Sequence, residues 1–503
     1  GGTLTVNGYI AASGETWQSN AASPGAGAGG SIWITAASVA GTTGKIQAVG
    51  GHSLWGDGND NNGGAGSGGR IAVYADSITL PEDNFDAYGG AGWSEGESGG
   101  DAAPGTIYLA VDGQRPKLII DNDAVRSNVR ITMLPDSVLI PGDVYVRDRA
   151  RLGVERGYES VYWPIAGDLS IEPGCDIWAA GRGYWADQGP GAGQWGFNWG
   201  GGGGHGGKGG DGRSDDPYAL GGMPYGSDLM PTTRGSGGAT DPNTGAGSGG
   251  GGGALWIRVE GELSLRGNSE AGGFGGGANE AGGGAGGSIL IEAGSVTGIA
   301  TVRANGGAGN SVGGGGGGGR IAVYSCDVDP RIAFQVAGGG SSGGGAGAPG
   351  TLVQQGVAIG SDPQDAEANI GSEVTFHAEA LGVGLTMRWQ KDGIPLSDGD
   401  TPHGSAIAGS GTSLLTISNV RPEDFGAYRL AITNGCGQAL SAPGMLSGVC
   451  AADFNNDGVV DTRDFVAFLN AWVAGDARAD IDENGTVDSR DVIMFLNLWR
   501  AGC

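Results

Sequence analysis

Short alternations of apolar and polar residues run through roughly the first 350 residues of the chain. One begins near the start, at Leu4, Val6, Ile10 and Ala12, and another in the middle, at Leu169, Ile171, Ile177 and Ala179. A period of two predicts β-strands that bury one face. No helical period separates these strands, so the pattern is typical of a region built from many short strands.

Part of this region is duplicated within the chain. The matching segments are Ala28–Gly41 with Ala285–Gly298, Arg70–Tyr74 with Arg320–Tyr324, and Ala103–Thr106 with Ala348–Thr351. Because the matches keep the same order, a unit of several strands has been copied. Repeated strands can bury their apolar faces by stacking coil on coil. We therefore predict a glycine-rich β-solenoid, similar to a parallel β-helix, over residues 1–356; an array of β-sandwiches is the alternative.

Glycine supplies 112 of the 503 residues, much of it in long runs such as 200–204, 249–253 and 313–319. These runs have no side chains to bury, and ordering them costs more backbone entropy than for any other residue. Their regular placement between strands nevertheless favours order over flexible linkers. We expect tight corners, or extended segments that stack through backbone hydrogen bonds alone.

A second composition begins near residue 357, where the glycine runs stop and longer alternating strands appear, as in Glu373–Ala378 and Tyr428–Thr433. Trp389 in an early strand and Asp424–Tyr428 before a late one resemble the core tryptophan and the tyrosine corner of immunoglobulin-like domains. The inter-sheet cysteines of that family are absent, since Ala378 and Leu430 stand in their places. The resemblance implies a β-sandwich over residues 357–448.

The last segment, 449–503, contains two loops with the spacing of calcium ligands, 27 residues apart. Oxygen donors fall at positions 1, 3, 5, 7, 9 and 12, with glycine at 6. The predicted ligands, with the main-chain carbonyl at position 7, are Asp453, Asn455, Asp457, Val459, Asp461 and Asp464, then Asp480, Asp482, Asn484, Thr486, Asp488 and Asp491. Hard oxygen donors in this number suit Ca²⁺ better than Mg²⁺. Two calcium ions are therefore expected.

Each loop leads into a predicted helix with an apolar stripe, formed by Phe465, Phe468, Leu469 and Trp472 and then by Val492, Phe495, Leu496 and Trp499. Aspartate at position 12 and the lack of a helix before each loop resemble type I dockerins. That resemblance implies a cohesin-like partner, contacted by loop positions 10 and 11, namely Thr462, Arg463, Ser489 and Arg490. A neighbouring copy of the chain, giving a homopolymer, is the other partner considered.

The chain has five cysteines, too few and too scattered for a disulfide scaffold. Cys450 and Cys503 bracket the dockerin-like segment. This arrangement is similar to dockerin-bearing surface proteins of planctomycete bacteria, and the resemblance implies a disulfide between these two cysteines that closes the module.

Charge and hydropathy limit the classes of partner and the cellular locations that the sequence predicts. The 54 acidic residues against 27 basic ones give a net charge of −27, which would repel nucleic acid. No apolar run is long enough to predict a membrane span. A chain that opens on Gly1 is what an exported, processed protein would look like, and also what a fragment would look like. We expect an extracellular or cell-surface location.

An enzyme is the alternative that a β-helix raises, because polysaccharide lyases and hydrolases on that fold use clustered carboxylates. The acidic residues that would have to converge are Asp83, Asp86, Asp121, Asp123, Asp143 and Asp148. No recurrent acidic pair and no paired histidines mark a catalytic site, so no catalytic residue is predicted. The aromatic group Tyr184, Trp185, Trp195, Phe197 and Trp199 could stack on sugars or cover an apolar flank.

Together these features predict a mainly β, non-catalytic structural or adhesive protein of a bacterial cell surface or extracellular filament. It would be attached or assembled through a calcium-dependent dockerin. The alternative is a polysaccharide-binding or polysaccharide-degrading β-helix protein displayed through the same module.

Overall fold

The computed structural model describes residues 2–16, 25–53, 64–92, 102–123, 131–213, 217–240, 249–277, 280–448, 451–455, 459–482 and 484–501. The chain divides into two compact units. The first comprises residues 1–356 together with 382–384, and the second comprises residues 357–381 and 385–503. Most of the secondary structure is β-strand, as the alternating pattern predicts.

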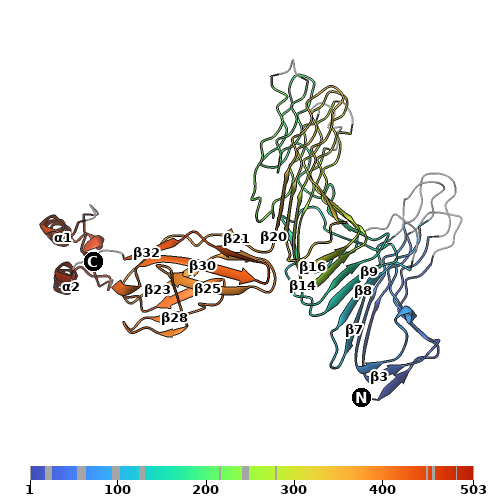
Figure 1. The fold of residues 1–503 in the computed structure, drawn as a ribbon, viewed down its shortest axis with the longest axis horizontal. Helices are drawn as coiled ribbons and strands as arrows, with labels where there is room; N and C mark the ends of the chain where they lie inside the picture. Colours follow the sequence, from blue (N-terminus) through green and yellow to red (C-terminus); the bar gives the residue numbers. More distant parts are fainter. Residues whose placement is uncertain are drawn as a thin grey trace. The chain divides into compact units, whose positions relative to one another are not determined.

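The largest sheet of the first unit has 12 strands among the described residues (Figure 1). In spatial order they are β1 (Thr3–Thr5), β3 (Ser31–Ala40), β5 (Arg70–Ile78), β7 (Thr106–Val111), β8 (Lys117–Asp121), β9 (Asp143–Arg147), β12 (Leu169–Ile171), β14 (Ala254–Leu265), β16 (Ser288–Gly298), β18 (Arg320–Tyr324) and β20 (Thr351–Gln355), with β11 (Val161–Ile165) also pairing with β14.

Two smaller sheets continue the same chain path. One consists of β2 (Tyr9–Ala11), β4 (Lys45–Gln47) and β6 (Phe85–Asp86). The short 3₁₀ turn η1 (Glu82–Asn84) directly precedes β6. The other consists of β10 (Arg151–Gly153), β13 (Asp176–Trp178), β15 (Asn268–Glu270), β17 (Thr301–Arg303) and β19 (Ala333–Gln335). All pairs in both sheets are parallel. The chain therefore alternates between sheets and returns beside its earlier passage.

The large sheet is not parallel throughout, which departs from the predicted single parallel stack. β7 and β8 pair antiparallel, and the strands on each side of them pair parallel. The turn between them contains Asp112-Gly113, with φ of +70° at the glycine, and an Asp-Gly pair is a strong local signal for a hairpin. Two buried cores meet here, because Ile119 belongs to the first and its neighbour Ile120 to the second.

The glycine runs form an ordered bundle in which backbone bonds to backbone. From Gly314 to Gly319, successive amides donate to three different neighbouring segments and return to the first after three residues. The pairs are Gly314 to Gly200 and Gly317 to Gly203; Gly315 to Gly345 and Gly318 to Ala348; Gly316 to Gly307 and Gly319 to Ala304. A period of three is that of a polyproline II helix, which has no internal hydrogen bonds and offers its amides to neighbours.

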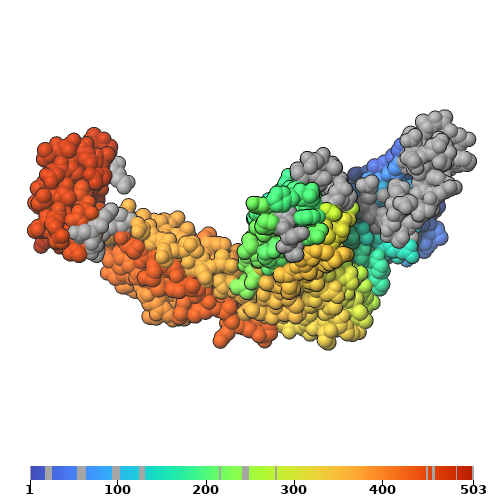
Figure 2. Space-filling view, turned by 90° about the horizontal axis from the view of Figure 1, so that it is seen from above, coloured from blue at the N-terminus to red at the C-terminus, as the bar shows by residue number. Residues whose placement is uncertain are grey.

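The run 282–287 repeats this arrangement. Its donor–acceptor pairs are Gly282 to Ala239 and Ala285 to Ser236; Gly283 to Gly314 and Gly286 to Gly317; Gly284 to Phe274 and Gly287 to Ala271. A Cβ atom on Gly316 would lie 2.0 Å from the carbonyl oxygen of Gly284, so only glycine fits. The structure thus confirms the prediction of stacked extended segments. In Figure 2 the visible surface of this part of the first unit is coloured green to yellow.

The second unit begins with a β-sandwich. One sheet contains β22 (Ala366–Ala368), β32 (Gly444–Gly448), β30 (Gly426–Asn434), β25 (Thr386–Lys391), β26 (Ile394–Pro395) and β31 (Gly437–Leu440). The other contains β23 (Glu373–His377), β29 (Leu414–Ser418), β28 (Ala406–Ala408) and β27 (Gly399–Asp400). A separate pair is β21 (Ala358–Ser361) with β24 (Glu379–Leu381), and a 3₁₀ turn, η2, spans Pro422–Asp424.

The structure confirms the core tryptophan and the tyrosine corner that the sequence predicts for this sandwich. Trp389 is fully buried and lies beside Phe376, which stacks on Tyr428 with ring centroids 4.9 Å apart. The Tyr428 hydroxyl donates to the carbonyl oxygen of Asp424 at 2.6 Å, which is the predicted tyrosine corner. Ala378 and Leu430 are fully buried where the family's cysteines would stand, so apolar packing fills that position.

The chain ends in two α-helices of equal length, α1 (Thr462–Ala474) and α2 (Ser489–Ala501), with the 3₁₀ turn η3 (Ala477–Ala479) between them (Figure 1). Both were predicted from their apolar stripes. Phe468 and Phe495 stack face to face with centroids 4.0 Å apart, and both are fully buried. The two equivalent stripes therefore bury each other. No helix among the described residues is long and apolar enough to cross a membrane.

Candidate metal centre

Three carboxylates converge in the second loop of the C-terminal segment. Oxygen atoms of Asp480, Asp482 and Asp491 lie within 4.8 Å of one another. Asp480 and Asp482 are half-buried, and Asp491 is fully buried at the start of α2. Like charges held so close repel unless a cation or a proton sits among them. This group joins predicted positions 1, 3 and 12.

The main chain of the loop is wrapped around these side chains. Asp491 accepts from the amides of Ile481 at 2.8 Å and Asp482 at 3.2 Å through one oxygen, and from Asp488 at 2.7 Å through the other. Burial acts to raise the pKa of Asp491, but these backbone N–H groups outweigh it and hold that pKa below its usual value. The carboxylate is thus kept ionised, as a metal ligand must be.

The turn at the tip of the second loop also fits the spacing. Asp480 accepts from the amides of Asn484 at 3.1 Å and Gly485 at 2.8 Å. Gly485 at position 6 has φ of +83°, a left-handed conformation that favours glycine. The side-chain oxygen of Asn484 accepts from the amide of Thr486 at 3.0 Å. Carboxylate, amide and carbonyl oxygens are the donor set that Ca²⁺ prefers.

The first loop is built in the same way where the structure describes it. Asp464, fully buried at the start of α1, accepts from the amide of Asn455 at 3.0 Å and from that of Asp461 at 2.8 Å. These bonds correspond to those that Asp491 accepts from Asp482 and Asp488 in the second loop. In both loops, the aspartate at position 12 therefore accepts hydrogen bonds from the backbone amides at positions 3 and 9. The predicted ligand Asp457 lies outside the described residues, and so do Cys450 and Cys503.

The aspartates at position 9 lie at the helix starts. Asp461 caps α1 by accepting from the amide of Arg463 at 2.7 Å, and its other oxygen pairs with the Arg463 guanidinium at 2.8 Å. Asp488 and Arg490 form the same pair at 3.0 Å. Position 9 of such loops often reaches the ion through water. In the first loop the predicted carbonyl ligand at position 7 belongs to Val459, whose side chain is exposed.

The four predicted partner-binding residues all lie at the exposed beginning of a helix. Thr462 and Ser489 are exposed, and the side chains of Arg463 and Arg490 are 68% and 72% exposed. Each arginine is held by the aspartate two residues before it. The structure thus places the four residues in two equivalent exposed pairs, one beside each loop.

Two hydrogen bonds that the sequence pattern does not predict connect the two loops. The Trp472 indole nitrogen of α1 donates to the carbonyl oxygen of Asp488 at 2.7 Å, and Trp499 of α2 donates to the carbonyl oxygen of Asp461 at 2.9 Å. Each helix therefore holds position 9 of the opposite loop. Both tryptophans had been assigned only to the apolar stripe. Their equal spacing from the loops was the signal available in the sequence.

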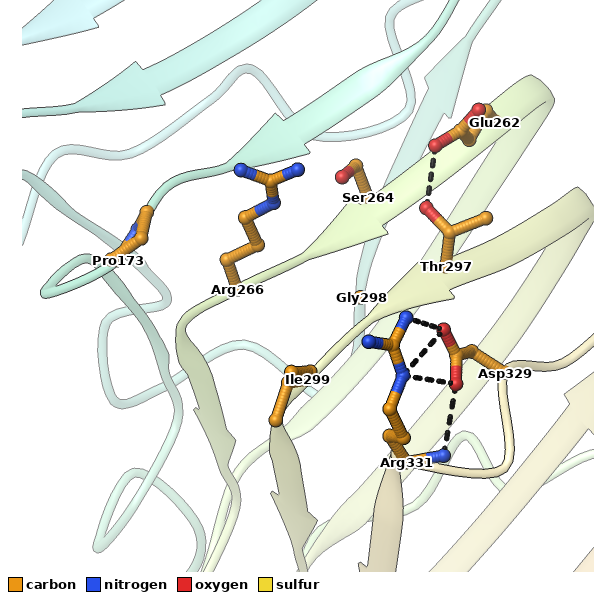
Figure 3. A pocket seen from close by; sticks show the side chains of 9 residues that line it. All are labelled: Pro173, Glu262, Ser264, Arg266, Thr297, Gly298, Ile299, Asp329 and Arg331. Atoms are coloured by element: carbon orange, nitrogen blue, oxygen red, sulfur yellow. Dashed lines mark hydrogen bonds and ion pairs between the residues drawn. The ribbon is translucent and has the colours of Figure 1, made fainter.

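A polar hollow of about 570 Å³ lies in the first unit, where β14 and β16 end (Figure 3). Its lining includes Glu262, which accepts from Thr297, and Asp329, which holds the guanidinium of Arg331 at 2.6 Å. Arg266 also lines the hollow, and its side chain forms no hydrogen bond or ion pair with any residue that the structure describes. The hollow offers hydroxyl, carboxylate and guanidinium groups to a polar ligand.

The acidic residues considered for catalysis are partly brought together, with basic partners. Arg147 bridges Asp121 at 2.6 Å and Asp83 at 3.9 Å, and Lys45 pairs with Asp86 at 2.8 Å. Asp143 faces Arg115 at 3.6 Å. Burial, followed by repulsion from neighbouring carboxylates, raises the pKa of Asp123 and of Asp148. The pairing of these carboxylates with arginine and lysine is typical of an ion-pair network that supports the fold.

The aromatic group of residues 184–199 is divided between exposed and half-buried positions. Trp185 and Phe197 are more than half exposed, and Tyr184, Trp195 and Trp199 are half-buried. The guanidinium of Arg156 lies 3.6 Å from the ring centroid of Trp185. These rings therefore form part of the surface of the glycine-rich lobe.

Comparison with known proteins identifies one part of the chain. Residues 357–442 match the immunoglobulin I-set domain family. Cardiac-type myosin-binding protein C of Mus musculus is 35% identical over 71 residues, which are 14% of this chain and 5% of that protein. The sandwich is thus an immunoglobulin-like domain, as its tryptophan and tyrosine corner predict.

Solved structures resemble the same segment. Titin M4 is 20% identical, covers 18% of this chain and 95% of its own, and has a TM-score of 0.17. Titin M3 is 29% identical with the same coverage and a TM-score of 0.16. The N-terminal Ig1-2 module of the Drosophila receptor protein tyrosine phosphatase DLAR is 22% identical, covers 20% of this chain and 54% of its own, and has a TM-score of 0.17.

Proposed function

We propose that this protein is a non-catalytic, extracellular structural or adhesive protein of bacterial origin, attached through a calcium-binding C-terminal module of the type I dockerin kind. Residues 1–356 would form a β-solenoid body, made of two parallel-stranded stacks, and the immunoglobulin-like domain would be a spacer. The observation that carries the proposal is the convergence of Asp480, Asp482 and Asp491 in a loop that the chain repeats.

Two features support a pair of calcium sites of equal design. Both position-12 aspartates, Asp464 and Asp491, are buried and receive the same two backbone hydrogen bonds. Bound calcium would neutralise carboxylates that otherwise repel, so calcium binding and folding of the module would be linked. The ligands would be the residues predicted from the loop spacing, with Asp464 and Asp491 at the centre of each site.

Calorimetric titration of the metal-free full chain with calcium tests the sites. We expect two bound ions per chain, and one after either Asp464→Asn or Asp491→Asn, because each substitution removes a charged ligand from one loop. Asp476→Asn is the matched control, since Asp476 pairs with Arg478 outside both loops. Absence of saturable binding, or equal stoichiometry in all variants, would overturn the proposal.

Attachment is tested separately, with a type I cohesin module as the probe in calcium and then in chelator. We expect calcium-dependent binding that weakens about tenfold in the double variant Arg463→Ala/Arg490→Ala, as for removal of arginine hot spots. Arg478→Ala is the control, because its arginine forms the same kind of aspartate pair and is equally exposed at 72%. Binding that ignores calcium, or that the control weakens as much, would contradict a dockerin role.

A neighbouring copy of the chain is the other partner to test. Electron microscopy of the protein in calcium and in chelator separates the two cases. Filaments or end-to-end contacts that disappear with chelator would support assembly of copies through the module. Dispersed single particles in both conditions would exclude self-assembly under those conditions and leave a distinct partner.

The hollow near Arg266 supports a second candidate function, polysaccharide binding by the β-solenoid body (Figure 3). Its Ser264, Thr297 and Glu262 side chains offer the donors and acceptors that sugar hydroxyls need, and Arg266 adds a cation for an acidic sugar. Titration with polygalacturonate tests this role. Binding that is lost in Arg266→Ala but retained in Arg70→Ala would support it, and equal binding by both variants would exclude this hollow as the site.

A further inference from the structure

The duplicated strands of the first unit keep the same register in both copies. Ser31, Arg70 and Thr106 lie opposite one another on β3, β5 and β7, and Ser288, Arg320 and Thr351 do so on β16, β18 and β20. The outward faces of the two copies can therefore be compared row by row. They differ in what covers them.

In the second copy the face is covered by residues 225–233 of the same chain. Arg320 donates to the carbonyl oxygen of Tyr225 at 2.8 and 3.0 Å and forms an ion pair with Asp228. Ser288 donates to the carbonyl oxygen of Thr233 at 2.6 Å. These contacts fix both ends of the segment.

The contacts continue along the segment. Tyr324 donates from its hydroxyl to the carbonyl oxygen of Leu229 at 2.6 Å, and Thr351 donates to the Asp228 carboxylate at 3.2 Å. Ser288, Leu290 and Tyr324 are fully buried on this face, and Arg320 is 5% exposed. The segment is not extended throughout, because Gly226 has φ of +83° and the amide of Met230 donates to the Ser227 hydroxyl at 3.1 Å. A bent peptide segment with one aspartate is thus the occupant that this face accepts.

In the first copy the same positions are open. Trp33, which corresponds to Leu290, is 71% exposed. Ser31 and Arg70 are exposed, and the Arg70 guanidinium has no hydrogen bond or ion pair with any described residue. Tyr74, the counterpart of Tyr324, is half-buried and stacks on Trp33 with centroids 4.8 Å apart, and Tyr108 follows at 5.7 Å. The polar groups that hold the segment in one copy are therefore present in the other, where the described residues provide no partner for them.

We propose that the outward face of β3, β5 and β7 is a docking site for an aspartate-bearing peptide segment of a partner protein. The Arg70 guanidinium would pair with the aspartate, as Arg320 does with Asp228. Tyr74 would donate to a backbone carbonyl, as Tyr324 does to that of Leu229. Trp33, where the covered copy has leucine, would add aromatic contact area at the centre of the site. The charge complementarity is specific, since the chain as a whole carries −27 and would repel an acidic segment elsewhere.

A synthetic peptide with the sequence of residues 225–233, capped at both ends and fluorescently labelled, is the probe. We expect saturable binding to the full chain by fluorescence anisotropy, weakened about tenfold by Arg70→Ala, because a charge-assisted hydrogen bond is lost. Trp33→Ala should weaken it by a similar factor. Replacing the aspartate of the peptide with asparagine should reproduce the loss in the wild-type chain and add little in Arg70→Ala. Arg149→Ala is the control, an exposed arginine of the same unit whose side chain has no partner among the described residues, and it should bind normally.

Three results would overturn the proposal. The first is no saturable binding of the peptide at millimolar concentration. The second is binding that Arg70→Ala and Trp33→Ala leave unchanged, which would place the peptide elsewhere, such as on the face of the second copy. The third is self-association of the wild-type chain in sedimentation analysis that Arg70→Ala abolishes, which would make a second copy the occupant.

Discussion

The indole nitrogen of Trp472 donates a 2.7 Å hydrogen bond to the carbonyl oxygen of Asp488, and its counterpart Trp499 reaches back to Asp461. Each helix of the C-terminal module is thus tied to the loop that starts the other. Ordering of one loop fixes the helix that supports the second, so the module has a physical route by which its two loops are coupled.

Replacing either tryptophan by phenylalanine keeps the ring but removes the donor. We expect Trp472→Phe and Trp499→Phe each to lower the free energy of unfolding of the module by about 1 kcal/mol, the net worth of a typical hydrogen bond. The measurement is chemical unfolding followed by circular dichroism at 222 nm in calcium. A loss confined to one of the two variants would show that the reciprocal arrangement is not energetically equivalent.

The glycine-rich bundle should reject even one methyl group. In Gly316→Ala the new Cβ would lie 2.0 Å from the Gly284 carbonyl oxygen, so backbone segments must separate. We expect a loss of at least about 1–3 kcal/mol, the usual cost of overpacking a tight interior. Gly340→Ala is the control, because its Cβ would meet no atom within 4 Å. Thermal unfolding of the full chain should separate the two variants, and equal midpoints would contradict the packing.

The first unit should lose stability in mild acid through His205, which is fully buried in the bundle. Its Nδ1 lies 2.8 Å from the carbonyl oxygen of Gly286, which can only accept, so Nδ1 carries the proton and Nε2 accepts from Thr233 at 2.9 Å. Burial lowers the pKa of His205 from 6.5 to about 4. The folded state therefore resists a proton that the unfolded state takes up as the pH falls below 6.5.

The resulting loss of stability should develop between about pH 6.5 and pH 4 and approach about 3 kcal/mol at its lower end. His205→Gln removes the titrating group, so its unfolding free energy should depend less on pH over this range, although it is lower at neutral pH. Unfolding midpoints of both proteins, measured from pH 7.5 to 4, provide the check. Parallel pH profiles would contradict the assignment.

Cys175 should be inert towards thiol reagents in the folded protein. Its side chain is fully buried and free, and burial raises the pKa of the thiol to about 12, so almost no thiolate forms at neutral pH. We expect maleimide to label Cys175 only after denaturant unfolds the first unit, as followed by mass spectrometry of the peptide that contains it. Rapid labelling under native conditions would show that the buried core around Cys175 opens readily.

Tyr428→Phe tests the tyrosine corner of the immunoglobulin-like domain. The substitution leaves the buried ring in place but removes the donor to the Asp424 carbonyl oxygen at 2.6 Å. We expect a loss of about 1–2 kcal/mol, because a buried acceptor loses its partner. Thr416→Ser, on the half-buried strand β29, is a mild control. An unchanged melting temperature in Tyr428→Phe would mean that the hydroxyl contributes no net stability.

The features that sequence predicted well were local ones. Trp389 and Tyr428 identified the sandwich core because a single residue pattern, apolar alternation with a fixed aromatic spacing, describes that fold. The convergence of three carboxylates in the second loop follows from their spacing, since all of them belong to one short stretch of chain, and their role as calcium ligands stays a prediction. The sequence predicted that the glycine runs are ordered. It did not predict the three-residue period of their hydrogen bonds, because a run of identical residues does not show which residue faces which neighbour.

Long-range relations were decided only by the tertiary structure. The sequence shows that Arg70 and Arg320 belong to copies of the same unit, yet not that one is buried under residues 225–233 and the other is exposed. Nor does it show that β7 and β8 pair antiparallel, although the Asp-Gly turn was a signal for it. By itself the sequence determined which residues share a face or a loop, because backbone periodicity fixes this locally. Which faces meet depends on how distant segments pack, and that energy is shared among contacts that no single stretch of sequence contains.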